Sequence, residues 1–296
     1  MPLLVLLLIA AAAGLVSGTV AWRYPRSLPG GASAKPVAEA VGEVAAYHRG
    51  VRAFVKRRRD PVAATGLALT IALGAVIAGG VVIGVLAFLV RSKQSALDID
   101  TGPARWGFEH ATPFTTRWLE RITSLGDATV VISLAILLAV VETIRVRSRS
   151  VIPFVLVVTL GNHLVTTAVK DLADRARPTL NPIAQTLGPS FPSGHSSTAA
   201  AFYAAAALLI GRRRGHVART WLAALAVTIA VAVAATRVLL DVHWLSDVIA
   251  GLFLGWAWFA LCAIAFGGRL VRFGATAERA TDAARAASPP AAAAEV

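Results

Sequence analysis

The chain has 296 residues, 56% of them hydrophobic, and a mean hydropathy of +0.68, which excludes an ordinary soluble domain and indicates a membrane protein. Its formal charge of +13 would indicate a nucleic-acid partner in a soluble protein. Here the basic residues lie mostly between apolar segments, so we interpret them as markers of membrane topology and expect no nucleic-acid partner. The single cysteine, Cys262, lies within an apolar segment and excludes a disulfide framework or a thiolate metal cluster.

The first apolar segment, residues 2–22, carries no charge and is long enough to cross a bilayer, which takes about 20 residues. Positive charges follow this segment, at Arg23 and Arg26, and no basic stretch precedes it. We therefore expect an uncleaved transmembrane anchor. A cleaved signal peptide is the alternative.

Residues 33–59 have a different pattern, in which apolar side chains recur at alternating steps of four and three and so predict an amphipathic helix. Its polar face and its end are basic, which suits a helix that lies on an anionic leaflet. A connecting helix that packs on the rest of the protein is the alternative. The basic residues are Arg49, Arg52, Lys56, Arg57, Arg58 and Arg59.

Six further apolar segments are predicted to span the membrane, which gives seven spans in all. A mixed polar and aromatic stretch at 91–127 is typical of membrane interfaces. The residues beyond Arg269 end in a proline-containing and alanine-rich run, and we expect them to be largely disordered. The six segments are residues 62–90, 128–144, 151–169, 197–211, 221–240 and 246–267.

The distribution of Lys and Arg predicts the orientation of these spans. The segments that connect the spans alternate between two sets. One set carries 20 Lys and Arg residues, and the other carries 8. The first set is 23–61, 145–150, 212–219 and 269–296, and the second is 91–127 and 170–196. The basic set is expected to face the cytoplasm. The N-terminus, the 170–196 segment and the stretch after Arg237 then lie on the extracytoplasmic side.

The run Phe191-Pro192-Ser193-Gly194-His195 lies between two apolar segments and places a fixed φ, a residue without Cβ, a hydroxyl and an imidazole next to one another. The amides of Ser193, Gly194 and His195 would lie at the N-terminus of the following helix, where unpaired N–H groups and the helix dipole favour an anion such as phosphate. An ordinary N-capped helix start is the alternative for this motif taken alone.

Two more groups of reactive residues fall at membrane boundaries on the same side. One is Lys170, followed after six residues by Arg177-Pro178; the other is Thr236-Arg237, followed by His243 and, four residues later, Asp247. Each has an ordinary explanation alone, as an anchor, a snorkelling side chain or a helix-end pair. Their convergence favours one polar site, because a charged Arg237 beside an apolar span is costly without partners.

These residues suit phosphoryl transfer without a metal. Three cations, Lys170, Arg177 and Arg237, would neutralise the phosphate oxygens. Asp247 would accept the Nδ1 proton of His243 and leave Nε2 free to attack phosphorus. His195 would then protonate the departing oxygen. Asn162 and His163 lie deeper on the preceding span, where they line the cavity floor or make a helix-packing hydrogen bond.

Taken together, the three motifs resemble the signature of the type 2 phosphatidic acid phosphatase superfamily, over roughly residues 62–267. The one departure is Thr236, where this family usually has Ser; because Thr keeps the hydroxyl, we expect the phosphate contact to survive. The resemblance implies a phosphohistidine on His243, and it implies no metal or other cofactor. It assigns Asp247 as the orienting partner, His195 as the general acid, and Lys170, Arg177, Ser193, Gly194 and Arg237 as the phosphate pocket.

The resemblance also implies the fold and the activity. We expect an all-α polytopic membrane protein, and the resemblance implies its six-helix transmembrane phosphatase core (62–268). The N-terminal anchor and amphipathic helix (1–61) and the cytoplasmic tail (269–296) lie outside the resemblance and are expected from the apolar and basic patterns alone. The protein would hydrolyse a lipid phosphate at the outer face of the cytoplasmic membrane, with undecaprenyl diphosphate as the preferred candidate.

Phosphatidic acid and phosphatidylglycerophosphate are the alternative substrates. A lipid phosphotransferase with the same catalytic residues is a second reading, and an anionic-lipid binder or transporter is a third. The sequence leaves the oligomeric state open.

Overall fold

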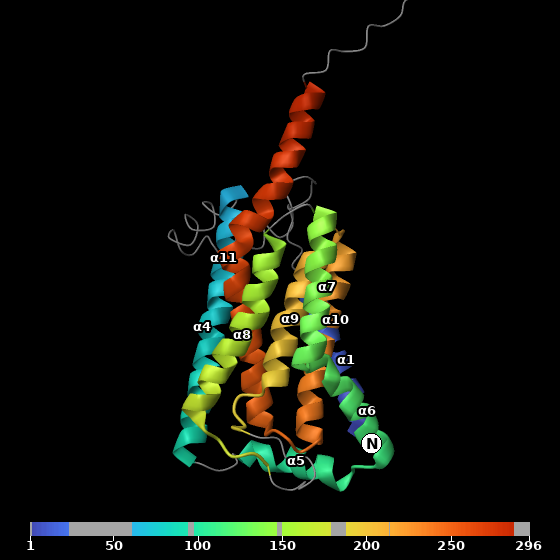
Figure 1. The fold of residues 1–296 in the computed structure, drawn as a ribbon, viewed down its shortest axis with the longest axis vertical. Helices are drawn as coiled ribbons and strands as arrows, with labels where there is room; N and C mark the ends of the chain where they lie inside the picture. The colour runs from blue at the N-terminus through green and yellow to red at the C-terminus, as the bar shows by residue number, and fades with distance from the viewer. Residues whose placement is uncertain are drawn as a thin grey trace, which may run out of the picture.

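The computed structural model describes residues 2–23, 61–93, 98–146, 150–178, 188–212 and 214–286, and within them all regular structure is helical. Figure 1 shows long helices side by side, with two shorter helices at one end of the bundle. The predicted all-α class is confirmed. The long helices are α1 (Pro2–Arg23), α4 (Pro61–Lys93), α7 (Ala128–Val146), α8 (Val151–Ala173), α9 (Gly194–Gly211), α10 (His216–Leu239) and α11 (Leu245–Ala286).

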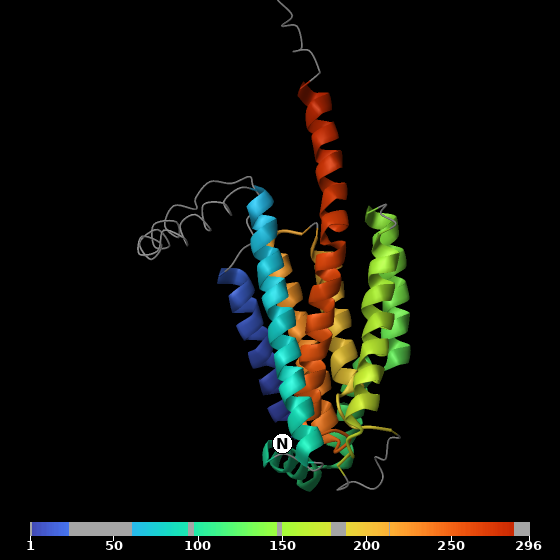
Figure 2. The ribbon, with the colours of Figure 1, turned by 90° about the vertical axis from the view of Figure 1, so that its left-hand side faces the viewer.

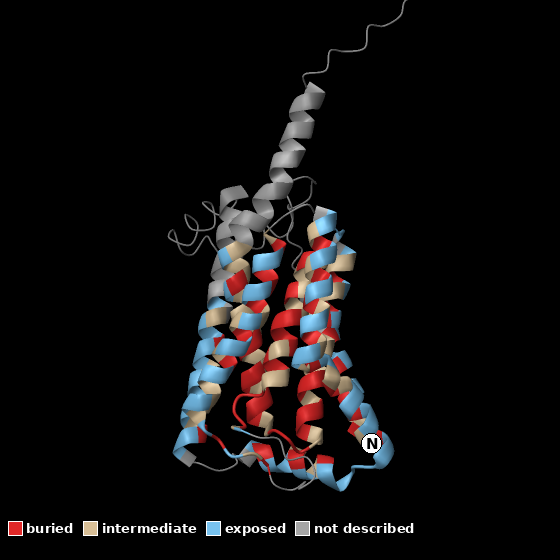
Figure 3. Cartoon of the chain, in the orientation of Figure 1, coloured by how far each residue is buried: buried red, intermediate tan, exposed pale blue. Residues whose placement is uncertain are grey.

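Each predicted apolar segment coincides with one of these long helices. Among the described residues, four helices are long and apolar enough to cross a membrane: α7, α8, α10 and the first part of α11. Shorter apolar stretches occur at Pro2–Leu15 in α1 and Val76–Ser92 in α4. Many large apolar side chains on the outer helices are exposed, whereas the buried residues lie towards the bundle centre (Figure 3). The chain is thus a multi-pass, all-α membrane protein.

Helix α9 lies at the centre of the bundle, where it packs against α7, α8, α10 and α11. Its alanines allow this close packing, and the glycines of α11 complete it: a Cβ on Gly255 would overlap the carbonyl oxygen of Ser197, and one on Gly251 would crowd that of Ser193. Small residues let helix backbones approach closely in a membrane. This contact fixes the N-terminus of α9 beside the N-terminus of α11.

The stretch at 91–127 folds into α5 (Asp98–Glu109), α6 (Pro113–Thr123) and the short 3₁₀ helix η1 (Ser124–Gly126). Helix α6 starts at a capping box in which the Thr112 hydroxyl accepts the backbone N–H of Thr115 at 3.2 Å, and Pro113 occupies the first turn. Figures 1 and 2 show α5 across the end of the bundle where the labelled N-terminus lies, and Figure 1 shows α6 inclined at the side of the same end.

The C-terminal tail departs from its prediction. Helix α11 continues to Ala286, so the expectation of disorder beyond Arg269 is wrong over that range. The physical reason is composition: residues 275–286 are rich in alanine and contain no glycine or proline, so they favour helix. The predicted amphipathic helix at 33–59 and residues 287–296 lie outside the described residues.

Candidate active site

All eight predicted site residues lie at the end of the bundle that carries α5 and α6. They come from the last turn of α8, the loops 174–178 and 188–193, the start of α9, the end of α10, the turn 240–244 and the start of α11. These elements are far apart in sequence, and the packing of α9 between α8, α10 and α11 brings their ends together. The residues are Lys170, Arg177, Ser193, Gly194, His195, Arg237, His243 and Asp247.

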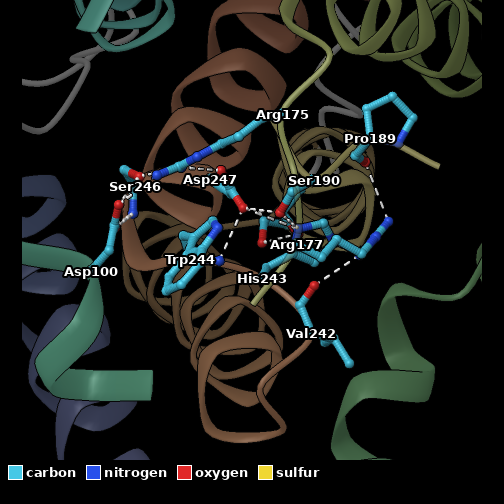
Figure 4. A network of polar contacts seen from close by, with 12 residues as sticks. Asp100, Arg175, Arg177, Pro189, Ser190, Val242, His243, Trp244, Ser246 and Asp247 are labelled. Atoms are coloured by element: carbon cyan, nitrogen blue, oxygen red, sulfur yellow. Dashed lines mark hydrogen bonds and ion pairs between the residues drawn. The ribbon is translucent and has the colours of Figure 1, made fainter. Parts of the chain in front are cut away.

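His243 and Asp247 form a buried pair at the centre of the site (Figure 4). The Nδ1 atom of His243 lies 3.5 Å from Oδ2 of Asp247. The same carboxylate oxygen accepts the backbone N–H of Trp244 at 2.9 Å and the hydroxyl of Ser190. Asp247 is therefore fixed by several donors, and Nε2 of His243 is the ring nitrogen that faces away from it.

The environment keeps His243 neutral. Burial lowers its pKa to about 4, and the nearby Arg177 and Arg237 add to the effect, whereas Asp247 opposes it. A neutral imidazole has a free lone pair on one nitrogen. With Nδ1 on the Asp247 side, that lone pair belongs to Nε2, the atom that the sequence analysis assigns to nucleophilic attack.

Arg177 lies directly at this nitrogen. Its Nη1 atom is 3.2 Å from Nε2 of His243 and also donates to the carbonyl oxygen of Val242 at 2.8 Å. Its other nitrogens donate to the carbonyl oxygens of Gly188 and Pro189. Burial lowers the pKa of Arg177, which Asp247 opposes, and the guanidinium stays charged. A positive fork thus lies where a phosphate attacked by Nε2 would carry its charge.

The other two predicted cations flank this pair. Lys170 donates to the Pro189 carbonyl oxygen at 2.7 Å. Arg237 is buried, and its backbone carbonyl oxygen accepts the backbone N–H of His243 at 3.1 Å. Its Nη1 atom donates to the hydroxyl of Thr123 at 3.0 Å, and its Nε atom has no hydrogen-bond partner among the described residues. A buried guanidinium with a spare donor suits an anion.

Two details of the phosphate pocket differ from the sequence-based expectation. The Ser193 amide donates to the carbonyl oxygen of Asp247 at 3.0 Å, so it is not free for an anion. The amides of Gly194 and His195 remain at the N-terminus of α9, where a helix has no internal acceptors for them. The Thr236 hydroxyl donates to the carbonyl oxygen of Val233 at 2.6 Å, a bond that threonine often makes within its own helix.

His195 has a carboxylate partner that the sequence analysis did not identify. Its Nε2 atom lies 2.6 Å from Oδ1 of Asp127, between η1 and α7. His195 is partly buried and Asp127 about half exposed. The signal in the sequence is weak, because Asp127 lies 68 residues before its partner, at the end of a stretch whose role the pattern does not define.

Arg175 is the second residue that the motifs do not reveal. It lies within the interval between Lys170 and Arg177, and it is buried. Its guanidinium bridges Oδ1 of Asp247 at 2.6 Å and Oδ2 of Asp100 at 2.7 Å, and it stacks 5.6 Å from the ring of Trp244 (Figure 4). Asp247 thus has an ion-pair partner as well as hydrogen-bond donors.

Asn162 and His163 take no direct part in this cluster. Asn162 accepts the hydroxyl of Ser197 at 2.8 Å, a hydrogen bond between α8 and α9, and His163 is exposed on α8. Among the described residues, no three His, Cys, Asp or Glu side chains lie close enough together to hold a metal ion. The positive charge of the site comes from side chains.

The comparison with known protein families agrees with the motifs, because residues 151–270 match the model of the PAP2 superfamily. This region is a PAP2 superfamily domain. The resemblance predicted from three motifs is thereby confirmed, and the PAP2 domain contains every predicted site residue.

Curated relatives of the PAP2 domain are phosphatases by name. The chain is 47% identical over 72 residues to a lipid A 1-phosphatase of Rhizobium johnstonii, which covers 24% of this chain and 25% of the relative. It is 33% identical over 102 residues to phosphatidylglycerophosphatase B of Bacillus subtilis, covering 34% of this chain and 50% of the relative. The chain therefore spans between a quarter and a half of the length of these relatives.

A solved structure shares the fold. It is the crystal structure of a transmembrane PAP2 type phosphatidylglycerolphosphate phosphatase from Bacillus subtilis, and it superposes with a TM-score of 0.60. The superposition covers 66% of this chain and 96% of that chain, at 24% sequence identity. This likeness establishes the transmembrane PAP2 fold.

Proposed function

We propose that this protein is a membrane lipid phosphatase that works through a phosphohistidine on His243 and needs no metal ion. One observation carries the proposal: a buried, neutral imidazole has its Nδ1 atom 3.5 Å from the Asp247 carboxylate and its Nε2 atom 3.2 Å from a guanidinium nitrogen of Arg177. An attacking nitrogen and a cation for the phosphate oxygens are thus side by side. The names of the phosphatase relatives support the same reaction class.

In the proposed reaction, Nε2 of His243 attacks phosphorus and the bond from phosphorus to the leaving oxygen breaks. Arg177, Arg237 and Lys170 neutralise the charge that spreads over the other phosphate oxygens. The His243 ring becomes positively charged as the N–P bond forms, and the Asp247 carboxylate stabilises that charge.

His195 completes both half-reactions. It donates a proton to the leaving oxygen in the first step and takes a proton from water in the second, when water attacks the phosphohistidine and releases inorganic phosphate. Transfer to a hydroxyl of another lipid in place of water would make the protein a phosphotransferase with the same first step.

We propose a lipid phosphate as substrate because the site lies at one end of a bundle of apolar helices, at the level of the interfacial helices α5 and α6. Undecaprenyl diphosphate is the preferred candidate. The alternative substrates are phosphatidic acid, phosphatidylglycerophosphate and the 1-phosphate of lipid A. The last two are included because relatives of this chain are named as phosphatases of those lipids. The catalytic unit is proposed to be residues 62–268, with the site on the extracytoplasmic side of the cytoplasmic membrane.

The test is release of inorganic phosphate from these four lipids by the detergent-purified protein, with EDTA present. We expect release from at least one lipid and none from His243→Ala. His163→Ala, a change to an exposed histidine on α8, is the matched control and should keep wild-type activity. A folded wild-type protein that releases no phosphate, or that stops when EDTA is added, would contradict the proposal.

A further inference from the structure

The described residues before the PAP2 domain include α5, α6 and η1, which lie at the site end of the bundle. Three side chains, in α5, at the end of α6 and directly after η1, contact residues of the predicted site or their neighbours in the PAP2 domain. Asp100 contacts Arg175 and Ser246, Thr123 contacts Arg237, and Asp127 contacts His195. Each of the three sequence motifs thus has a neighbour from residues 98–127.

We propose that residues 98–127 complete the active site by supplying three positioning side chains: Asp127 for His195, Asp100 for Asp247 through Arg175, and Thr123 for Arg237. The inference rests on the proposed function and extends it to a part of the chain that the family match leaves out.

The Asp127 contact makes a second carboxylate–imidazole pair in the site. Its distance of 2.6 Å is that of a charge-assisted hydrogen bond. Gly126 allows it, because a Cβ there would lie 2.6 Å from Cγ1 of Val233 and 3.1 Å from the carbonyl oxygen of His195. Only a residue without Cβ lets η1 come this close to α9 and α10, and so places Asp127 at the imidazole.

The pair of His195 and Asp127 determines which ring nitrogen of His195 transfers the proton. With Nε2 bound to Asp127, Nδ1 is the ring nitrogen left to give its proton to the leaving oxygen. The carboxylate stabilises the positively charged ring that is needed before transfer. Asp127 therefore acts through the proton transfers of His195, first to the leaving oxygen and later from water, whereas Asp247 acts through the nucleophile His243.

The Asp100 contact is fully buried. Its Oδ2 atom pairs with Arg175 and accepts the Ser246 hydroxyl at 2.9 Å, and its Oδ1 atom accepts the Ser246 backbone N–H at 2.8 Å. Ser246 precedes Asp247 in the first turn of α11. Asp100 thus holds both the backbone before Asp247 and the cation that pairs with it, and a buried pair of this kind keeps its geometry only while both partners are present.

The experiment compares two phosphate monoesters with the same alkyl tail, one with an aliphatic alcohol as leaving group and one with a nitrophenol. Nitrophenolate departs without a proton, so a residue that serves only the general acid matters little for it. We expect Asp127→Asn to lower kcat/KM about 10-fold to 100-fold on the aliphatic ester and to have little effect on the nitrophenyl ester, because kcat/KM reports the steps up to departure of the leaving group and not the later proton transfer from water. A purely structural role would lower both rates alike.

The other two positions give different patterns. Asp100→Asn should lower kcat by a similar factor on both esters, because it acts through the nucleophile. Thr123→Val should raise KM on both, and Thr123→Ser, which restores the hydroxyl, should return it to the wild-type value. Glu109→Gln is the matched carboxylate control on the same segment, since Glu109 is exposed and pairs with the exposed Arg105, and it should behave as wild type.

Thermal unfolding in detergent separates these effects from loss of the fold. If Asp100→Asn does not fold, the charge-balanced pair Asp100→Asn with Arg175→Gln takes its place, and the same loss on both esters is expected. Equal losses in kcat/KM on the two esters in Asp127→Asn, or wild-type rates in all three variants, would overturn the inference. Activity of the unmutated protein would still uphold the proposed function. A wild-type protein inactive on both esters would overturn the two together.

Discussion

The Asp247 carboxylate contacts several groups besides the His243 ring that it is proposed to orient. It faces Nδ1 of His243, pairs with Arg175, and accepts the Ser190 hydroxyl and the Trp244 amide. A carboxylate with so many donors keeps its charge and position during a reaction that changes the charge of its neighbour. At this residue, fold and chemistry depend on the same contacts.

We predict that Asp247→Asn lowers kcat by about 10³-fold to 10⁴-fold, because the amide neither stabilises the charged His243 ring nor fixes its tautomer. Phosphate release measures the loss, and thermal unfolding checks the fold. Turnover near that of wild type would remove Asp247 from the mechanism.

The pKa of His243 predicts an unusual pH dependence. Since burial lowers that pKa to about 4, Nε2 keeps its lone pair through the mildly acidic range and loses it only as pH falls towards 4. The substrate phosphate has its own second ionisation at about pH 6, and kcat/KM is corrected for it. We expect the corrected kcat/KM to stay constant down to about pH 5 and to decrease at lower pH. A decrease in kcat/KM that begins at about pH 6.5, the pKa of an ordinary histidine, would show that the His243 ring is not buried as described.

A substitution at Arg177 tests whether the planar geometry of the guanidinium matters for activity as well as its charge. Its three nitrogens donate to carbonyl oxygens and to His243 in a fork that a single ammonium cannot reproduce. We predict that Arg177→Lys lowers kcat/KM by about 10-fold or more. Arg121→Lys, on the exposed face of α6 beside Trp118, is the matched control and should have little effect. Equal activity in the two variants would contradict the pocket assignment.

The contact between α9 and α11 is the element on which the site geometry depends. It places Ser193 beside Asp247 through a backbone hydrogen bond of 3.0 Å, and glycines in α11 make the approach possible. Asp247 and the N-terminus of α9 are therefore fixed to one another by helix packing.

We predict that Gly255→Ala destabilises the protein by about 1–3 kcal/mol and lowers its activity, because the new Cβ would overlap the Ser197 carbonyl oxygen and push the two helices apart. Gly80→Ala in α4 is the control, since a Cβ there meets nothing within 4 Å. Unfolding in detergent measures both. A Gly255→Ala protein as stable as Gly80→Ala would mean that the helices are not packed this closely.

At the element scale, the spans were predictable because apolar length is a strong signal: the predicted segment at 128–144 became Ala128–Val146, and that at 151–169 became Val151–Ala173. The three motifs were predictable because their spacing is distinctive. The partners of the motif residues were not. Asp100 and Asp127 lie 147 and 68 residues from Asp247 and His195, and no local pattern encodes contacts over such separations.

At the scale of the whole molecule, one end of the bundle carries the site with helices α5 and α6, and the other end carries the C-terminus of α9 and the start of α10, where Arg212, Arg214 and Arg219 lie. The excess of Lys and Arg at the second end favours placing it in the cytoplasm. We therefore propose that the site end faces outwards, where it would meet a lipid phosphate of the outer leaflet.

Single cysteines test this orientation in a Cys262→Ala background, since Cys262 is the only native cysteine. In spheroplasts, a membrane-impermeant maleimide should label Glu109→Cys, at the site end, and should label Arg214→Cys only after permeabilisation. Both positions are exposed. Labelling in the reverse order would place the active site in the cytoplasm.

Capture of the phosphoenzyme is the most direct test of the proposed phosphohistidine. The protein is mixed with a lipid substrate labelled in the phosphate that is transferred, quenched within a turnover, and mapped by peptide mass spectrometry. We predict an acid-labile phosphate on His243 in the wild type and in His163→Ala, and none in His243→Ala. A phosphate on another residue, or single-turnover phosphate release with no labelled protein at any time, would contradict it.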